Sequence, residues 1–177
     1  MKKVIYFLVL GVLFLNCESK KEVPKTVDSN IEKTAINTVL NTWHKSAAEA
    51  NFKKYFNVMT AESIFIGTDA SENWNNTAFK EFSKPYFDKG KAWGFTPVER
   101  NVYVYKGGKV AWFDELLETQ MGICRGSGVL IKNDDIWKIE HYVLSLTIPN
   151  DNMDAVKLIN KEKDSLLLKK LKKIDFL

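Results

Sequence analysis

The sequence predicts one α+β domain, with helices in its first half and a long antiparallel sheet in its second half. Apolar residues recur at helical spacing over residues 31–50 and 76–87, and from residue 93 onward apolar and polar residues alternate. Turn-forming residues at 106–108 and 133–135 divide the alternating part into neighbouring strands. Helices followed by hairpin-connected strands are typical of α+β domains.

The first half predicts three helices and one strand. Ser29 or Asn30 is a suitable N-cap for the first helix, whose apolar residues recur at helical spacing. A β-rich run ending at Gly67 predicts the strand, and a turn-like stretch follows it. The expected elements are helices over residues 31–50, 51–58 and 76–87 and a strand over residues 63–67.

The second half predicts four strands and a C-terminal helix. Gly107 and Gly108 give a strong hairpin signal between the first two strands, and a three-residue loop at 133–135 is expected between the last two. Pro149 ends the sheet and precedes a helix that reaches about residue 173. The expected strands cover residues 93–105, 109–120, 124–132 and 136–147.

The N-terminus has the pattern of a secretory leader. Two lysines precede an uncharged, mostly apolar run from Val4 to Leu15, which is shorter than the roughly 20 apolar residues that span a bilayer. Cys17 follows, and the arrangement resembles the lipobox of bacterial lipoproteins, in the looser form familiar in Bacteroidetes, because Asn16 stands where Gly or Ala is usual. The resemblance implies that residues 1–16 are removed and that Cys17 is lipidated.

These observations predict four segments and a location. We expect a leader over residues 1–16, a lipidated Cys17 with a flexible polar tether to residue 30, a folded domain over 31–160 and a basic helical tail over 161–177. The expected location is the cell envelope, on the periplasmic side of the outer membrane. An uncleaved signal anchor with an incidental cysteine is the alternative.

Composition narrows the possible functions. The net charge is +4, and two of these charges belong to leader lysines, so the domain has no basic surface typical of nucleic-acid binding. Cys124 is the only thiol that remains once Cys17 is acylated, which excludes an intramolecular disulfide. No spacing of His, Asp, Glu or Cys predicts a metal site, and no cofactor is implied.

Five stretches give a family resemblance. A strongly curved sheet wrapped over the N-terminal helices would enclose a cavity, and this order of elements resembles the cone-shaped, cystatin-like roll of the nuclear transport factor two-like superfamily. The sequence is similar to SnoaL-like proteins in particular, over roughly residues 31–160. The matching stretches are FIGTDASENW, FSKPYFDKGKAW, VAWFDELLET, CRGSGVLIK and IWKIEHYVLSLTIPND.

Strand alternation predicts which residues face the interior of this cone. In the last strand Lys138 and Glu140 belong in water, so the face that bears Trp137, Ile139 and His141 is expected inside. The three-residue loop at 133–135 and the two tighter turns set the expected pairing of the strands. This pairing predicts which residues of the other strands lie on the same interior face. The expected ligand-binding residues are Asn101, Tyr103, Trp112, Asp114, Arg125, Ser127, Trp137 and His141.

Other residues receive simpler interpretations. His44 is expected on the surface, Glu115 is expected to face outward, and Asp69 and Glu72 lie on a loop expected near the mouth of the cone. The outward set of Phe113, Leu117, Leu130, Tyr142 and Leu144 is unusually apolar, which suggests either a homodimer or a cover formed by a helix or the C-terminal tail.

Three functions stay open. The favoured one is a membrane-anchored domain that binds a small apolar or amphipathic molecule without turnover. The second is a hydrolase, isomerase or cyclase in which Asp114 is the general base and Arg125 or His141 polarises the substrate, as the resemblance to this superfamily allows. The third is a homodimeric interaction module. For the polar cluster itself, a purely structural network that satisfies buried charges is the alternative to a binding site.

Overall fold

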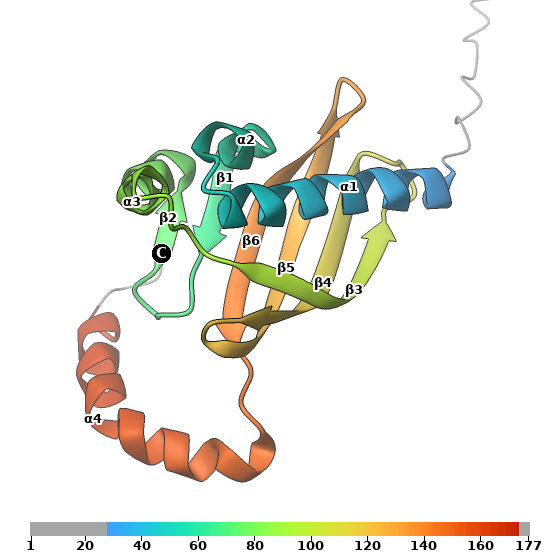
Figure 1. Cartoon of the computed structure of the whole chain (residues 1–177). Coiled ribbons are helices and arrows are strands. Elements are labelled where there is room, and N and C mark those ends of the chain that lie inside the picture. The colour runs from blue at the N-terminus through green and yellow to red at the C-terminus, as the bar shows by residue number, and fades with distance from the viewer. Residues whose placement is uncertain (1–27, 174–177) are drawn as a thin grey trace, which may run out of the picture.

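The computed structural model describes residues 28–173 (Figure 1). The predicted leader and Cys17 lie outside the described residues. The element order is that of an α+β fold, with the helices α1 to α3 and two short strands before a run of four long strands. The predicted fold class is confirmed.

Helix α1 (Ser29–Ala48) lies across the concave face of the sheet (Figure 1). Asp28 caps it, because its Oδ1 accepts a hydrogen bond from the Asn30 backbone N–H at 2.9 Å. The cap is therefore one residue earlier than the two candidates that the sequence offered. The helix buries an apolar stripe at helical spacing against the sheet: Ile36, Leu40, Trp43 and Ala47.

Two further helices close one end of the sheet. Helix α2 (Phe52–Asn57) is a short continuation of the chain after a turn at Ala50, and helix α3 (Asn76–Asp88) is capped by the Asn75 side chain. Both lie beside β1 in Figure 1. Their rings interlock, for example Phe56 with Phe79 at a centroid distance of 5.6 Å.

The sheet has six strands in the order β2-β1-β6-β5-β4-β3. All neighbouring strands are antiparallel except β1 and β6, which are parallel. The strand β2 was not predicted from the sequence. The strands are β1 (Met59–Ile66), β2 (Asn73–Asn75), β3 (Phe95–Val104), β4 (Val110–Thr119), β5 (Gly122–Asn133) and β6 (Ile136–Leu146).

The predicted pairing across β3, β4 and β5 is confirmed. Asp114 of β4 pairs with Asn101 of β3 on one side and with Ser127 of β5 on the other, and Leu116 pairs with Arg125. The two turns that set this register were therefore interpreted correctly.

The pairing of β5 with β6 differs from the prediction. Asn133 pairs with Ile136, which leaves a two-residue turn in place of the expected three-residue loop. Both turn residues, Asp134 and Asp135, have positive φ values of 49° and 61°, as the tightest hairpins require. The shorter turn places Lys132 opposite Trp137 and moves every residue of β5 to the face opposite the predicted one.

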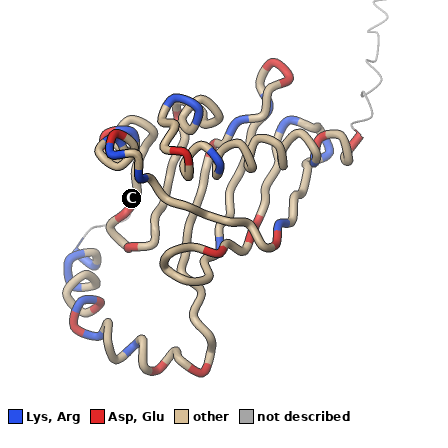
Figure 2. Tube along the Cα trace, viewed as in Figure 1, with Lys and Arg blue, Asp and Glu red and all other residues tan. Residues whose placement is uncertain are grey.

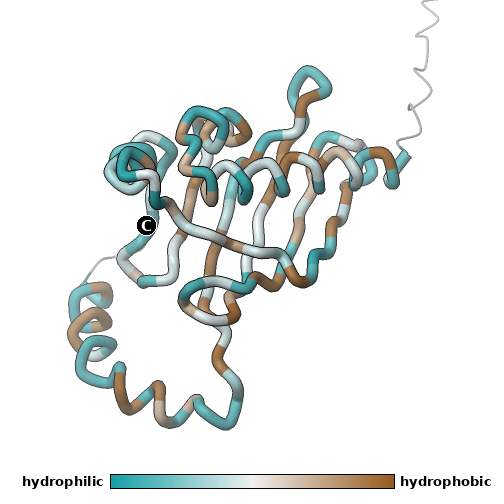
Figure 3. The backbone as a smooth tube through the Cα atoms, viewed as in Figure 1, coloured by the Kyte–Doolittle hydropathy of each residue, from teal (hydrophilic) through white to brown (hydrophobic). Residues whose placement is uncertain are grey.

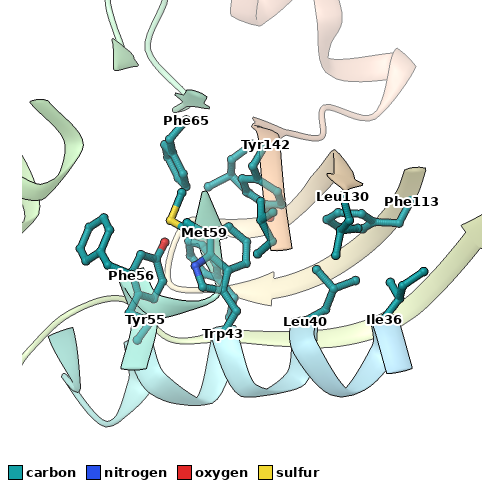
Figure 4. Packing of buried hydrophobic residues seen from close by; sticks show 14 of the residues in the cluster. Ile36, Leu40, Trp43, Tyr55, Phe56, Met59, Phe65, Phe113, Leu130 and Tyr142 are labelled. Carbon is teal, nitrogen blue, oxygen red and sulfur yellow. The ribbon is translucent and has the colours of Figure 1, made fainter. Parts of the chain in front are cut away.

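The core lies between α1 and the concave face of the sheet (Figure 4). Figure 2 shows the charged residues mainly in loops and helices, including the C-terminal helix, with long uncharged stretches through the sheet. The apolar residues that the sequence predicted on the outward side of the sheet lie at the centre of the core: Phe113, Leu117, Leu130, Tyr142 and Leu144. Their expected outward orientation is wrong, and the cover is helix α1.

Helix α4 (Met153–Leu171) follows the 3-10 turn η1 (Asn150–Asn152) and extends away from the sheet (Figure 1). It runs without a break across residue 160. Its substantial contacts are with η1 alone among the described elements, and Ile159 and Leu166 are exposed. Figure 3 shows hydrophobic segments recurring along this helix. None of the helices within residues 28–173 is long and apolar enough to cross a membrane.

Candidate functional site

Seven of the eight predicted binding residues share one face of the sheet, but it is the face turned away from α1. We call this convex surface the outer face. Trp112 and Tyr103 are 45% and 43% exposed there, and Arg125 is also exposed. The prediction that these side chains line the interior is wrong. The members of the outer-face cluster are Asn101, Tyr103, Trp112, Asp114, Arg125, Ser127 and His141.

Two local features cause this result. The two-residue turn after β5 reverses the faces of β5, β4 and β3 relative to the start of β6. A β-bulge then places one extra residue, Glu140, between Ile139 and His141, so His141 leaves the face that Ile139 occupies. The turn moves the six residues of β3, β4 and β5 to the outer face, and the bulge moves His141 to the same face. His141 therefore still lies beside the other six residues.

Trp137 is the exception, because it stays in the core at 3% exposure. Its indole Nε1 donates to Glu32 Oε2 of α1 at 2.7 Å, and Lys132 lies over its ring with Nζ 2.8 Å from Glu32 Oε1. These bonds from Lys132 and Trp137 hold the pKa of Glu32 below its usual value, although burial opposes them. Trp137 therefore fastens α1 to the sheet.

The outer-face cluster forms little internal structure. Asn101 Nδ2 donates to Asp114 Oδ1 at 3.2 Å, and the rings of Tyr103 and Trp112 stack with centroids 5.7 Å apart. Asp114 and Arg125 do not form an ion pair with each other, and Arg125 has no ion pair within residues 28–173. Neither the predicted base nor the predicted polarising group is held in place by a neighbouring charge.

A cavity of about 130 Å³ opens instead at the end of the core near α3. Its walls come from β1, β2, α3, the segment before β3 and the turn between β4 and β5. Six aromatic side chains dominate the lining, which also holds one carboxylate, that of Glu72. We call this cavity the aromatic pocket, and it is lined by Phe65, Gly67, Thr68, Glu72, Trp74, Phe79, Phe82, Trp93, Phe95, Gln120, Met121 and Leu144.

The aromatic walls are packed against one another. Phe65 and Phe79 stack with centroids 4.0 Å apart, and Trp74 stacks on Phe82 at 4.4 Å. The ring of Trp93 lies at the end of this series, with its centroid 5.8 Å from that of Phe79. Because each ring is held by its neighbours, the pocket is a preformed apolar site rather than a gap between mobile side chains.

Two buried polar atoms lie behind the pocket wall. The hydroxyl of Tyr55 and the indole N–H of Trp43 have no hydrogen-bond partner among the described residues. The two rings stack with centroids 5.2 Å apart (Figure 4). The ring of Tyr55 also contacts the pocket residue Trp93, at a centroid distance of 5.5 Å. Burial raises the pKa of Tyr55 well above its usual value, which keeps the hydroxyl protonated as a donor.

The Glu72 carboxylate is fixed at the pocket wall by its own loop. Its Oε2 accepts the Asp69 backbone N–H at 3.1 Å, while the Glu72 carbonyl accepts the Gly67 N–H at 3.0 Å. A Cβ at position 67 would overlap this carboxylate, so the glycine creates the space that it occupies. The expectation that this loop lies near the mouth of the cone agrees with the lining of the pocket.

A second polar group, centred on Glu115, is buried between α1, β3 and β4. Glu115 is 1% exposed, its Oε1 accepts from His44 Nε2 at 2.8 Å, and its Oε2 accepts from Arg100 Nε at 2.8 Å. Arg100 Nη1 also donates to Asn41 Oδ1 of α1 at 2.8 Å. We call Glu115, His44 and Arg100 the buried triad; the expectations that Glu115 faces outward and that His44 is a surface residue are both wrong.

The triad is a group of charges in which Glu115 is paired with both His44 and Arg100. Burial alone would raise the pKa of Glu115, but the hydrogen bond and charge of His44 and those of Arg100 outweigh it and hold this pKa below its usual value. Tyr142 adds a weaker hydrogen bond at 3.4 Å, and burial together with the Glu115 charge raises the pKa of Tyr142 well above its usual value. Such a group stabilises a carboxylate and leaves it little tendency to take a proton.

One signal in the sequence could have found the triad. His44 follows Leu40 by four residues and Trp43 by one, so it lies on the buried stripe of the first helix. A histidine buried at that position needs a partner, and Glu115 is the carboxylate on the core face of β4. The aromatic pocket gave no comparable signal, since its walls come from distant segments.

Other possible sites are weaker. No group of three or more His, Cys, Asp or Glu side chains in the described part of the chain could hold a metal ion. Two larger hollows, of about 500 and 490 Å³, are lined by α4 residues alone and are grooves on the surface of one helix. Cys124 is buried in the core.

Solved structures show the same fold at low sequence identity. An NTF2-like protein of unknown function from Pseudomonas putida KT2440 aligns with a TM-score of 0.60 and 10% identity, over 70% of this chain and 92% of that one. The association domain of CaMKII from C. elegans aligns at 0.56 and 20%, over 66% and 97%. An NTF2-like protein from Cytophaga hutchinsonii aligns at 0.54 and 13%, over 65% and 98%.

No curated protein matches the sequence closely enough to count as a relative. The family comparison is decisive, because residues 36–149 match the family described as SnoaL-like domain. This match covers more than half of the chain and includes most of α1, both α2 and α3, and all six strands. The chain therefore belongs to the SnoaL-like domain family, and it shares its fold with solved NTF2-like proteins.

Proposed function

We propose that the domain binds a small apolar or amphipathic molecule in the aromatic pocket and releases it unchanged. The observation that carries this proposal is the pocket itself, a preformed cavity of about 130 Å³ with six aromatic walls and a single carboxylate. Sites of this composition, apolar with a few fixed polar groups, are typical of small-molecule binding. The volume suits a small molecule or one end of a longer one.

The chemistry around the pocket favours binding over turnover. Glu115, the carboxylate most deeply buried in the described chain, is already paired with Arg100 and His44, so it is poorly suited to accept a proton. A hydrolase, isomerase or cyclase based on Asp114, Arg125 and His141 has less support, because these side chains belong to the outer face and none of them lines the aromatic pocket.

Native mass spectrometry of the protein purified gently from its own host tests the proposal. We expect an additional mass that is lost on denaturation. In Trp74→Leu, which removes a pocket wall, the additional mass should disappear, whereas Trp112→Leu on the outer face should retain it. An apo mass for the unsubstituted protein, or a bound mass that Trp74→Leu leaves intact, would contradict binding in this pocket.

We also propose that the domain is carried on a lipid anchor at Cys17, on the periplasmic side of an outer membrane. The support is the apolar run from Val4 to Leu15, the position of Cys17 two residues after it, and the polar segment that follows. Several acyl chains on one residue would hold the protein at the membrane stably. Intact-mass measurement of the membrane fraction should show loss of residues 1–16 and a gain of acyl mass, and Cys17→Ser should abolish both.

A homodimer formed through the outer face is the second candidate. The observation that favours it is that no element of the described chain covers this face, although Trp112, Tyr103 and Ile123 are exposed on it. Exposed apolar surface of this kind marks protein interfaces. The association domain of CaMKII, which shares the fold, is by its name a module of association.

A further inference from the structure

We propose that the aromatic pocket selects a methylated ammonium group, the cationic end of a small amphipathic molecule. The proposal deepens the proposed function and rests on it, because it names the chemical class that the same pocket takes. Three features of the pocket support this choice: the charges of its lining, the fixed position of Glu72 and the scarcity of other side-chain hydrogen-bond acceptors.

The lining is electronegative and contains no basic side chain. Six aromatic rings surround the cavity, and the faces of such rings attract cations through their quadrupole. Glu72 adds a formal negative charge at the wall, and its loop contains a second acid, Asp69, but no lysine or arginine. A carboxylate or phosphate in the ligand would be repelled by this arrangement, whereas a cation is attracted.

The charge of Glu72 is held in place before any ligand arrives. The Asp69 N–H donates to its carboxylate, and its backbone is bonded on both sides, to Asp69 and Gly67. Gly67 provides the room in which the carboxylate lies against the end of β1. A preorganised charge loses little conformational entropy on binding, so its attraction is available to the ligand.

The other polar groups of the lining distinguish between kinds of cation. A primary ammonium has three N–H donors that need acceptors, and besides Glu72 the only lining side chains that offer a hydrogen-bonding oxygen are those of Thr68 and Gln120. A methylated ammonium has few donors or none, and its methyl groups make apolar contacts with rings. The cavity volume of about 130 Å³ corresponds to roughly four water molecules, which suits a group of that size.

Lysines already occupy the opposite side of the same aromatic cluster. Lys80 lies over the ring of Phe56 and Lys84 over the ring of Phe52, at 5.6 and 5.7 Å from the centroids. Phe56 in turn contacts the pocket residue Phe79. None of the cation–ring contacts within residues 28–173 involves a ring of the pocket, so those rings remain open to a cation from outside.

The test compares two probes of the same shape that differ in charge. Choline and its neutral carbon isostere, 3,3-dimethylbutan-1-ol, are titrated into the full-length chain by isothermal titration calorimetry. We expect choline to bind at least about tenfold more tightly, as desolvated cation–ring contacts and one carboxylate predict. Trp74→Leu should weaken the binding of both probes, because it removes a wall that both contact.

Three variants isolate the role of the carboxylate. Glu72→Gln keeps its shape without the charge, and Gly67→Ala keeps the charge but displaces it, because the added methyl takes its place. Both should bring the two affinities to within about threefold of each other, since the remaining cation–ring preference is small at a partly open site. Glu62→Gln, an exposed carboxylate on β1, should leave the preference unchanged. Circular dichroism melting verifies that each variant is folded.

The outcomes separate this inference from the proposed function. Equal affinities for the two probes would overturn the ammonium class while supporting an apolar pocket. Two results would overturn the assigned site. One is a preference for choline that survives both Glu72→Gln and Gly67→Ala, and the other is choline binding that Trp74→Leu leaves unchanged. Binding of neither probe would overturn the inference, and the native mass spectrum would then decide the proposed function alone.

Discussion

At the scale of single residues, the buried triad is the most consequential feature of the domain. The side chains of Glu115 and Arg100 are 0% and 8% exposed, so both charges are removed from water. Removing one partner of a buried pair is costly, because the other charge is left buried and uncompensated. Gly126 is part of the same arrangement, since a Cβ there would overlap the Tyr142 hydroxyl and crowd Glu115.

We expect Glu115→Gln to lower the free energy of unfolding by about 3–5 kcal/mol, because it leaves Arg100 without its counter-ion. Urea denaturation followed by circular dichroism measures this change. Glu118→Gln, an exposed carboxylate on the same strand, is the control and should stay within about 0.5 kcal/mol of the unsubstituted protein. Equal effects of the two substitutions would show that the triad is unimportant for stability.

The triad also predicts a pH dependence with a definite sign. Because the pKa of Glu115 is lowered in the folded state, its stabilisation is complete above the pKa of the unfolded chain, near 4.5, and is lost as the pH falls through the lower folded value. Unfolding free energies measured from neutral to acidic pH should therefore fall more steeply below 4.5 in the unsubstituted protein than in Glu115→Gln. Parallel curves would contradict this explanation.

At the scale of elements, the turn between β5 and β6 determines the orientation of the sheet. Asp134 and Asp135 both adopt positive φ, which costs energy for residues with a Cβ and favours glycine. The turn nevertheless forms, because it allows Leu130 and Ile139 to face the core together. Burial of these apolar side chains outweighs the local cost of the turn.

We expect Asp135→Gly to raise the free energy of unfolding by roughly 0.5–1 kcal/mol, since glycine adopts the positive φ without strain. The weak, exposed ion pair with Lys132 that it removes contributes little. Asp135→Ala is the matched comparison and should bring no gain, because alanine keeps the Cβ. Urea denaturation of the three proteins measures both effects, and a gain in Asp135→Ala would argue against backbone strain as the cause.

Helix α4 contributes little to the fold, because its apolar residues are mostly exposed and its substantial contacts are with η1 alone among the described elements. Ending the chain after Pro149, where the family match also ends, should change the free energy of unfolding by less than about 1 kcal/mol. Denaturation of the shortened and full-length chains measures the difference. A larger loss would mean that α4 packs on the domain in solution.

At the scale of the whole molecule, the two faces of the sheet have different roles. The concave face holds α1, the buried triad and one wall of the aromatic pocket, while the outer face remains uncovered along all six strands (Figure 1). A stable interface between two copies would bury roughly 800 Å² on each. The central rows of the outer face, from Tyr103 and Trp112 to His141, offer continuous surface for such a contact.

We expect Trp112→Asp to convert the proposed homodimer into a monomer, because it places a charge at the centre of an apolar contact. Sedimentation equilibrium of the two proteins measures the mass in solution. Leu158→Asp on α4 is the control and should leave the dimer intact. A monomer in the unsubstituted protein would contradict the dimer, and dissociation by Leu158→Asp would assign the contact to α4.

The sequence by itself determined all the helices and strands except β2, and much of the strand pairing. Helical spacing located α1 and α3, alternation located β3 to β6, and turn residues predicted the register of Asp114 against Asn101 and Ser127. These features are local, because each depends on the periodicity or turn chemistry of a few neighbouring residues. The SnoaL-like family could be identified from the same stretches.

Tertiary structure alone decided which face of the sheet is buried and where the pocket lies. Which face is buried depends on the phase of the alternation between apolar and polar residues. One residue in the turn at Asp134, and one in the bulge at Glu140, each reverse this phase without changing the alternating pattern itself. The aromatic pocket depends on β1, α3 and the β4–β5 turn meeting in space, so no short stretch of sequence encodes it. Glu115 could be assigned to the core only once α1 was known to bring His44 over it.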